Sequence, residues 1–177
     1  SPGTVIITAA AEVEDVRRIS GPVVRNDDST ALFWIDMNGM RHELGGSVLG
    51  QTLGSLGEKA PGVEDPEYFA AAFEALQLLI KDGKIIAGHD ISAGGMIVTL
   101  LEMCFANRNG GMAVNLTEMG ETDTVRLLYS QNPGVVIQVA DEVETEEFLY
   151  SKGIRFASIG HPVMERKLFV ANGEERH

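Results

Sequence analysis

The chain has 177 residues, 44% of them hydrophobic, and a formal net charge of −12. This length allows one domain with a substantial core, or one domain with an accessory segment. The excess of carboxylates argues against nucleic acid and anionic membrane surfaces as partners, because binding to either depends on lysine and arginine neutralising phosphates. No apolar run approaches the ~20 residues that span a bilayer. One cysteine cannot form an internal disulfide, so a reducing cytoplasm is expected.

Two strands are predicted near the start of the chain. Thr4 to Ala10 is rich in β-branched residues, and Ala31 to Asp36 contains the only tryptophan. Asn38-Gly39 then marks a turn. Because the sequence begins without an initiator methionine or a basic signal segment, we expect it to be cut from a longer chain.

Paired glycines precede an apolar-periodic stretch over Val48 to Leu53. We interpret Gly45 and Gly46 as residues that let the start of a helix pack tightly against a neighbour. A flexible loop is expected over 54–62.

The best-marked helix follows this loop. Asp65 is expected to cap it, Pro66 suits its first position, and Lys81 with Gly83 marks its end. Its wide apolar face is typical of a helix in the core, and is formed by Tyr68, Phe69, Ala72, Phe73, Leu76, Leu79 and Ile80.

A third strand and a polar turn come next. Ile85 to Ala87 is a short apolar run typical of a buried strand, and Gly88 to Ser92 is expected to form the turn after it. The core-facing side of the following helix is expected to carry Ile97, Leu101, Cys104 and Phe105, with Met96 and Leu100 beside them. Cys104 is therefore interpreted as a small core residue and not as a nucleophile.

The second half of the chain alternates strands and helices. Strands are predicted at Met112 to Leu116, Val135 to Val139, Ile154 to Ile159 and Lys167 to Ala171. Helices are predicted at Val125 to Tyr129, capped by Thr122 or Asp123, and at Glu144 to Lys152. His161 is expected in a turn, and Asn172 to His177 as a fraying tail. The whole pattern predicts an α+β fold, a mixed β-sheet with packed helices.

The turn after the third strand suggests two kinds of site. Gly94 and Gly95 let another group approach the backbone, and the free N–H groups of a helix start favour an anion. Asp90 would repel a phosphate, but Mg²⁺ removes the conflict because it takes one or two carboxylates together with phosphate oxygens and water. In the structural alternative, Ser92 caps the helix by accepting from Gly94 or Gly95. The residues alone favour the cap, and the chain has no P-loop, G-x-G-x-x-G, paired CxxC or HExxH motif.

The run GHDISAGGMIVTLLEMCFA closely resembles the HD-x-S-x-GG segment of the large, single-chain phosphoribosylformylglycinamidine synthases (FGAM synthases). The resemblance covers nearly the whole chain, through TVIITAAAEVEDVRR, LGGSVLGQ, LLYSQNPGVVIQV and IGHPV. Several ordered motifs in one chain are more specific than one glycine-rich turn. Residues 1–177 are therefore identified as a member of this family, as its second AIR-synthase-type C-terminal domain.

This resemblance implies an ATP-dependent C–N ligase with glutamine amidotransferase activity. The family converts formylglycinamide ribonucleotide, ATP and glutamine to formylglycinamidine ribonucleotide, ADP, phosphate and glutamate in de novo purine biosynthesis. It implies that Asp90 binds Mg²⁺, and that Ser92, with Gly94 and Gly95, contacts a phosphate of a tightly bound auxiliary ADP. The implied partners are ATP or ADP, the preceding AIR-synthase-type domains and the glutaminase domain of the same parent chain. With this resemblance, the metal-phosphate interpretation is favoured over the cap. Ser92 can serve both roles, contacting the phosphate and capping the helix that follows.

Two positions depart from the family pattern. Ala93 stands where relatives often carry aspartate, and Ile91 where they often carry arginine, so the local charge is lower. The family's other magnesium ligands and its glutaminase cysteine belong to domains that this chain lacks, and Cys104 does not match that cysteine. We therefore expect the isolated chain to be inactive and to bind MgADP weakly, because its metal shell is incomplete.

Three alternatives stay open. The chain could belong to another ATP-dependent member of the same superfamily, such as aminoimidazole ribonucleotide synthase or selenophosphate synthetase. It could be a non-catalytic scaffolding domain whose glycines only permit close packing. It could also be a regulatory nucleotide-binding module, in which case binding should survive in isolation.

Overall fold

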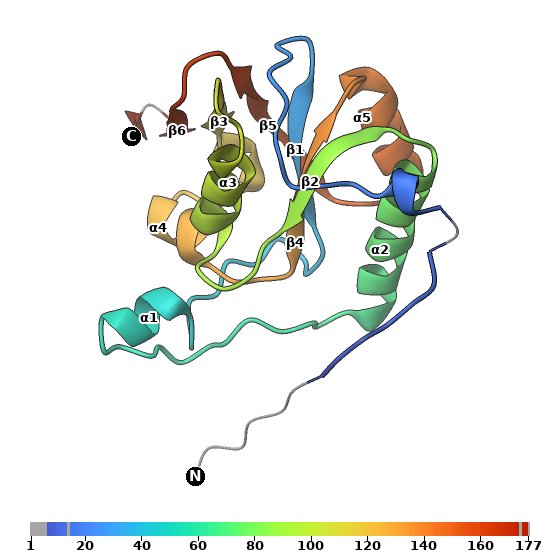
Figure 1. Cartoon of the computed structure of the whole chain (residues 1–177). Coiled ribbons are helices and arrows are strands. Elements are labelled where there is room, and N and C mark those ends of the chain that lie inside the picture. Colours follow the sequence, from blue (N-terminus) through green and yellow to red (C-terminus); the bar gives the residue numbers. More distant parts are fainter. Residues whose placement is uncertain (1–6, 14, 174, 177) are drawn as a thin grey trace.

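The computed structural model describes residues 7–13, 15–173 and 175–176, which form a sheet with helices on both faces (Figure 1). The strands are β1 (Ala31–Asp36), β2 (Ile85–Asp90), β3 (Gly111–Asn115), β4 (Gly134–Val139), β5 (Phe156–Val163), β6 (Leu168–Asn172) and β7 (Glu175–Arg176). The helices are α1 (Val48–Thr52), α2 (Pro66–Lys81), α3 (Met96–Phe105), α4 (Thr124–Tyr129) and α5 (Glu142–Ser151), with 3-10 turns η1 (Val16–Arg18) and η2 (Thr117–Met119).

The sheet of these strands is mixed, as the sequence predicts. Its order is β2-β4-β1-β5-β3-β6-β7. Neighbouring strands run antiparallel except β3 and β6, which are parallel. Within the described ranges, no helix combines the length and the apolarity that a bilayer crossing needs.

Strand β1 lies near the middle of the sheet and is buried on both faces. Leu32 and Trp34 point into the core under α3 and α4, whereas Phe33 and Ile35 point into the core under α2 and α5. Figure 1 shows the two helix pairs on opposite sides of the sheet. Full burial of each such side chain contributes about 1.5–3 kcal/mol, so this predicted strand anchors both cores.

The predicted start and end of α2 are confirmed. The Asp65 side chain accepts from the N–H groups of Glu67 and Tyr68 at 3.1 and 2.9 Å, and Pro66 is the first helical residue. The helix ends at Lys81, and Gly83 has a φ of +69°. Local capping chemistry therefore determines this helix.

The predicted strand over Thr4 to Ala10 is wrong where the structure describes it. Residues 7–10 form no strand, and Ile7 is 86% exposed; residues 4–6 lie outside the described ranges. A β-prone segment becomes a strand only when another strand supplies backbone partners, and none of the described strands pairs with this segment.

The end of the chain also differs from the prediction. His161 lies within β5 and not in a turn, because it pairs with Ala113 of β3. Strand β5 starts at Phe156 instead of residue 154. Asn172 belongs to β6, and Glu175–Arg176 pairs with it as β7, so part of the expected tail extends the sheet; residues 174 and 177 are outside the described ranges.

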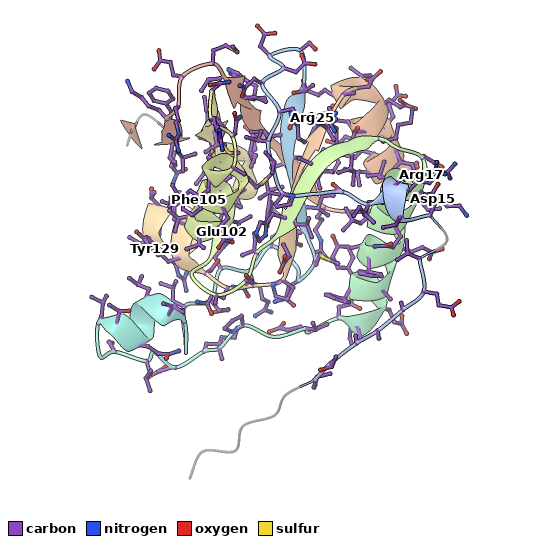
Figure 2. The ribbon with its side chains drawn as sticks, in the orientation of Figure 1. Asp15, Arg17, Arg25, Glu102, Phe105 and Tyr129 are labelled. Carbon is purple, nitrogen blue, oxygen red and sulfur yellow. The ribbon has the colours of Figure 1, made fainter. Side chains whose placement is uncertain are left out.

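Helix α3 faces the core with a different side from the one predicted. Its buried residues are Met96, Thr99, Leu100 and Met103. Phe105, which is labelled in Figure 2, was expected in the core but is 65% exposed, and Cys104 is half-buried. The helix carries apolar residues on most of its circumference, so periodicity alone did not distinguish its inner side.

Candidate functional site

Asp90 is the last residue of β2, and its side chain is 73% exposed. Its main-chain carbonyl accepts a hydrogen bond from Thr99 Oγ1 of α3 at 2.9 Å. The ring Nδ1 of His89 lies 2.8 Å from the same carbonyl oxygen. The backbone of Asp90 is thus held from two sides, and its carboxylate projects into solvent at the edge of the sheet.

His89 connects β2 to α3. Its Nε2 lies 2.9 Å from Oε2 of Glu102, and its Nδ1 lies 3.4 Å from Oδ1 of Asp90. Glu102 is on α3, whose ribbon lies beside β2 in the view of Figure 2. The ring therefore stands between two carboxylates, and its contacts fix the orientation of the end of β2 relative to α3.

The turn between β2 and α3 is shorter than predicted. Gly88, His89 and Asp90 belong to the strand, because Asp90 pairs with Val135 of β4. The expected Ser92 side-chain cap is wrong, since Gly95 is the N-cap residue and no side chain caps α3. Ser92 contributes its main-chain oxygen, which accepts from the Gly95 N–H at 3.0 Å. Its hydroxyl is exposed and makes no hydrogen bond to the other described residues.

Gly94 and Gly95 have φ angles of +96° and +79°, which side chains rarely adopt. A Cβ on Gly95 would lie 2.7 Å from the Leu128 oxygen and 2.8 Å from the Ser130 oxygen. The group that approaches Gly95 closely is therefore the end of α4. This close packing alone explains why position 95 requires glycine, whether or not a ligand binds nearby.

Gln131 joins this turn to α1. With its amide oxygen turned toward them, it accepts from the N–H groups of Gly94 and Val48, both at 2.9 Å. Val48 is the first residue of α1, which Ser47 caps by accepting from Gly50 at 3.1 Å. The two glycine-rich segments of the sequence thus meet at one side chain.

The tight-packing interpretation of the first glycine pair is confirmed at Gly45. Its N–H donates to the Lys59 oxygen at 2.8 Å, and a Cβ on Gly45 would overlap the Lys59 carbonyl group. Gly46 has a φ of +69°, and its N–H donates to Leu56 at 2.7 Å. These bonds close the loop after α1 back onto its start.

Within the described part of the chain, the start of α3 has free backbone donors. Met96 and Ile97 are the first residues of the helix, and no hydrogen bond among the described residues uses their N–H groups. A helix start with free N–H groups favours an anion. The described residues contain no cluster of three or more metal-ligating side chains. Mg²⁺ takes one or two carboxylates and completes its shell with phosphate oxygens and water, so the single carboxylate of Asp90 fits its requirements.

Asp90 also lines a groove of about 700 Å³ between α2 and the edge strand β2. The groove is mostly apolar, with Phe69 and Phe73 of α2 among its walls, and Gln131 lies at it as well. The sequence prediction missed both the groove and Gln131. The only available signal for Gln131 was its place in the segment LLYSQNPGVVIQV.

Two further titratable side chains, Cys104 and His42, lie partly or fully in the core. Cys104 is half-buried, and burial raises the pKa of its thiol, which disfavours the nucleophilic thiolate. His42 is 8% exposed, packs against the Trp34 ring at 5.7 Å between centroids, and has a pKa lowered by burial. Neither residue contributes to the surface around Asp90.

Comparison with known proteins agrees with this architecture. Thermotoga maritima PurL complexed with ATP is 14% identical, with a TM-score of 0.67 over 92% of this chain and 26% of that one. PurL complexed with FGAR is 17% identical, with a TM-score of 0.67 over 91% of this chain and 28% of that one. Escherichia coli HypE, a hydrogenase maturation protein, is 19% identical, with a TM-score of 0.57 over 90% of this chain and 51% of that one.

These likenesses show a shared fold, and the chain spans about a quarter of the length of the PurL chains. The family model described as "AIR synthase related protein, C-terminal domain" matches residues 37–170, which is most of the chain. The fold expected from the resemblance is thereby confirmed. The chain belongs to the family of AIR synthase related proteins, as their C-terminal domain.

Proposed function

We propose that this chain is the second AIR-synthase-type C-terminal domain of a phosphoribosylformylglycinamidine synthase, and that it helps hold an auxiliary Mg-nucleotide. The parent enzyme would be an ATP-dependent ligase of purine biosynthesis that uses glutamine as its ammonia source. The fold likeness to PurL, structures of which hold ATP, ADP or FGAR, supports this context. The single cysteine is consistent with a cytoplasmic enzyme.

One observation carries the proposal: the exposed Asp90 carboxylate lies at the end of β2, in the segment that leads into the start of α3. Mg²⁺ would neutralise the phosphate charge, so that carboxylate and phosphate can share one site. In this site Asp90 holds the metal, and the exposed Ser92 hydroxyl donates to a phosphate oxygen. The N–H groups of Met96 and Ile97 are aligned with the helix dipole, which favours the phosphate charge.

The glycines have a more indirect role in this proposal. Gly94 donates its N–H to Gln131, so a phosphate at that N–H would have to displace the Gln131 amide. Gly95 keeps the start of α3 close to the end of α4. Both glycines therefore shape the turn that presents Asp90 and Ser92.

The isolated chain is expected to bind the nucleotide weakly and to lack ligase activity. One carboxylate and one hydroxyl leave most of the metal shell to water and to residues of other domains. In the proposed parent enzyme, preceding AIR-synthase-type domains supply those residues, and a glutaminase domain supplies ammonia.

The test is an NMR titration of the chain with millimolar MgADP. Amide signals of Ser92, Met96 and Ile97 should shift, and Asp90→Asn should abolish the shifts. Asp82→Asn is the matched control, because it removes an exposed carboxylate at the other end of β2 and should leave the shifts unchanged. Equal shifts in wild type and Asp90→Asn, or no shifts at all, would refute the proposal. Submicromolar binding that depends on Asp90 would refute only the incomplete shell.

A second candidate is another ATP-dependent member of the superfamily, which the likeness to HypE over half of that protein supports. Its domain would use the same turn for a nucleotide, so the titration above does not separate the two. A substrate screen on the full-length parent does: turnover of formylglycinamide ribonucleotide with glutamine identifies the ligase, and its absence favours the alternative.

A further inference from the structure

The chain contains three Asn-Gly dipeptides, Asn38-Gly39, Asn109-Gly110 and Asn172-Gly173. In such a pair the glycine backbone nitrogen can attack the side-chain carbonyl carbon of asparagine, because glycine has no Cβ to hinder the approach. The new C–N bond closes a succinimide ring and expels the side-chain nitrogen as ammonia. One water then opens the ring to aspartate or isoaspartate. The sum is hydrolysis of one amide, and it needs no oxidant or cofactor.

The structure protects Asn38 from this reaction. Asn38 is 4% exposed, its Nδ2 donates to Asn132 Oδ1 at 3.3 Å, and its Oδ1 accepts from the Glu64 N–H at 3.1 Å. Both ends of the amide are held, so the carbonyl carbon cannot turn toward Gly39 until two hydrogen bonds break.

Asn172 is protected at both reacting groups. Its Nδ2 donates to the Thr122 oxygen at 3.0 Å and to Thr124 Oγ1 at 3.1 Å. The attacking nitrogen is also engaged, because the Gly173 N–H donates to Thr117 Oγ1 at 2.8 Å. This dipeptide therefore needs several contacts to open before its ring can close.

Among the described residues, Asn109 has no such hydrogen bonds, either at its side-chain amide or at the N–H of the following glycine. It is exposed in the turn between α3 and β3, where its backbone N–H donates to Asn107 Oδ1 at 3.2 Å. Across the described ranges, its side-chain amide makes no hydrogen bond, and the Gly110 N–H has no acceptor. We propose that Asn109 is a site of spontaneous deamidation in the folded protein, and that the other two dipeptides are held unreactive by the fold.

The modification would act on a closely packed junction. Gly110 and Gly111 have no room for a Cβ against Asn26 and Lys167 respectively. Isoaspartate at 109 inserts a methylene into the main chain just before this junction, which joins α3 to β3. Its formation should therefore loosen the junction and lower the Tm, besides adding a negative charge.

The test is to incubate the folded chain at neutral pH and physiological temperature and to follow the three dipeptides by peptide mapping and mass spectrometry. Asn109 should convert about tenfold or more faster than Asn38, because opening two hydrogen bonds in the buried pair slows the reaction by about that factor. In urea, where the fold is absent, the three rates should become similar.

Two variants sharpen this experiment. Asn109→Gln keeps the amide but disfavours the five-membered ring, and should prevent both the conversion and the slow fall in Tm. Thr117→Val removes the acceptor of the Gly173 N–H and should speed conversion at Asn172 alone. The proposal is overturned if folded Asn109 reacts no faster than Asn38 and Asn172, or if the ratio of rates is the same in urea.

Discussion

Gly94 donates its backbone N–H to the side-chain oxygen of Gln131 at 2.9 Å. The same oxygen accepts from Val48 at 2.9 Å, so one side chain connects the turn before α3 with the first residue of α1. The loop that contains α1 runs along one side of the molecule in Figure 1. Gln131 therefore holds the first residue of α1 and the turn before α3 to the same side-chain oxygen.

Replacing Gln131 should loosen both segments. Gln131→Ala leaves two N–H groups without their acceptor and should cost about 1–3 kcal/mol of unfolding free energy. Amide hydrogen exchange at Gly94 and Val48, measured by NMR, should become faster. Gln131→Glu keeps an acceptor oxygen and serves as the control. Unchanged exchange in Gln131→Ala would show that the two segments are held by other contacts.

Gly95→Ala should destabilise the fold strongly. The new Cβ would approach the Leu128 oxygen at 2.7 Å in a backbone conformation with φ +79° and ψ −168°, which glycine almost alone adopts, so overpacking of about 1–3 kcal/mol adds to strain of about 1–3 kcal/mol. Gly153→Ala is the matched control, since its φ is +67° but nothing lies within 4 Å of its Cβ. Urea denaturation should show a clearly larger loss for Gly95→Ala. Equal losses would contradict the close approach of α4.

The two sides of α3 should respond differently to truncation. Met103 is 0% exposed, so Met103→Ala should cost about 2–5 kcal/mol. Phe105 is 65% exposed, so Phe105→Ala should stay within about 0.5 kcal/mol. Chemical denaturation of both variants measures these costs. A larger loss for Phe105→Ala than for Met103→Ala would mean that the side of α3 predicted from the sequence faces the core after all.

Stability should fall below about pH 6.5 because of His42. Burial lowers the pKa of its ring from the ordinary 6.5, while the Met119 backbone and the charges of Glu121 and Asp36 oppose this shift, and Arg126 adds to it. Between the two pKa values the unfolded chain binds more protons than the folded chain. The contribution of the neutral ring is thus complete above the unfolded pKa and is lost as the pH falls through the folded pKa.

The slope from this one group cannot exceed about 1.4 kcal/mol per pH unit, because the two states differ by at most one proton on this ring. Urea midpoints of wild type and His42→Asn between about pH 5 and pH 7.5 measure it. Carboxylates contribute equally to both proteins, so the difference isolates His42. Identical slopes would mean that the folded protein accommodates the charged ring, in spite of a buried Nε2 that has no partner among the described residues.

Elements with complete local signals were predictable from the sequence. Asp65 caps α2, Asp123 caps α4, and β1 spans the predicted Ala31–Asp36. Capping depends on residues that are close together in the chain, and the unbroken apolar run of β1 is itself visible locally, although its burial comes from β4, β5 and the helices on both faces. Asp90 could be singled out for the same reason, because an acidic residue between an apolar run and a glycine-rich turn is visible locally.

What the sequence determined by itself was the order of most helices and strands, the mixed α+β class and the presence of a glycine-rich turn between β2 and α3. The tertiary structure decided which side of α3 faces the core, that residues 7–10 form no strand, and that Gly95 approaches the end of α4. It also placed Gln131 between Gly94 and Val48. Each of these depends on groups far apart in the chain, whose contacts arise only when the sheet forms and brings the loops at its edge together.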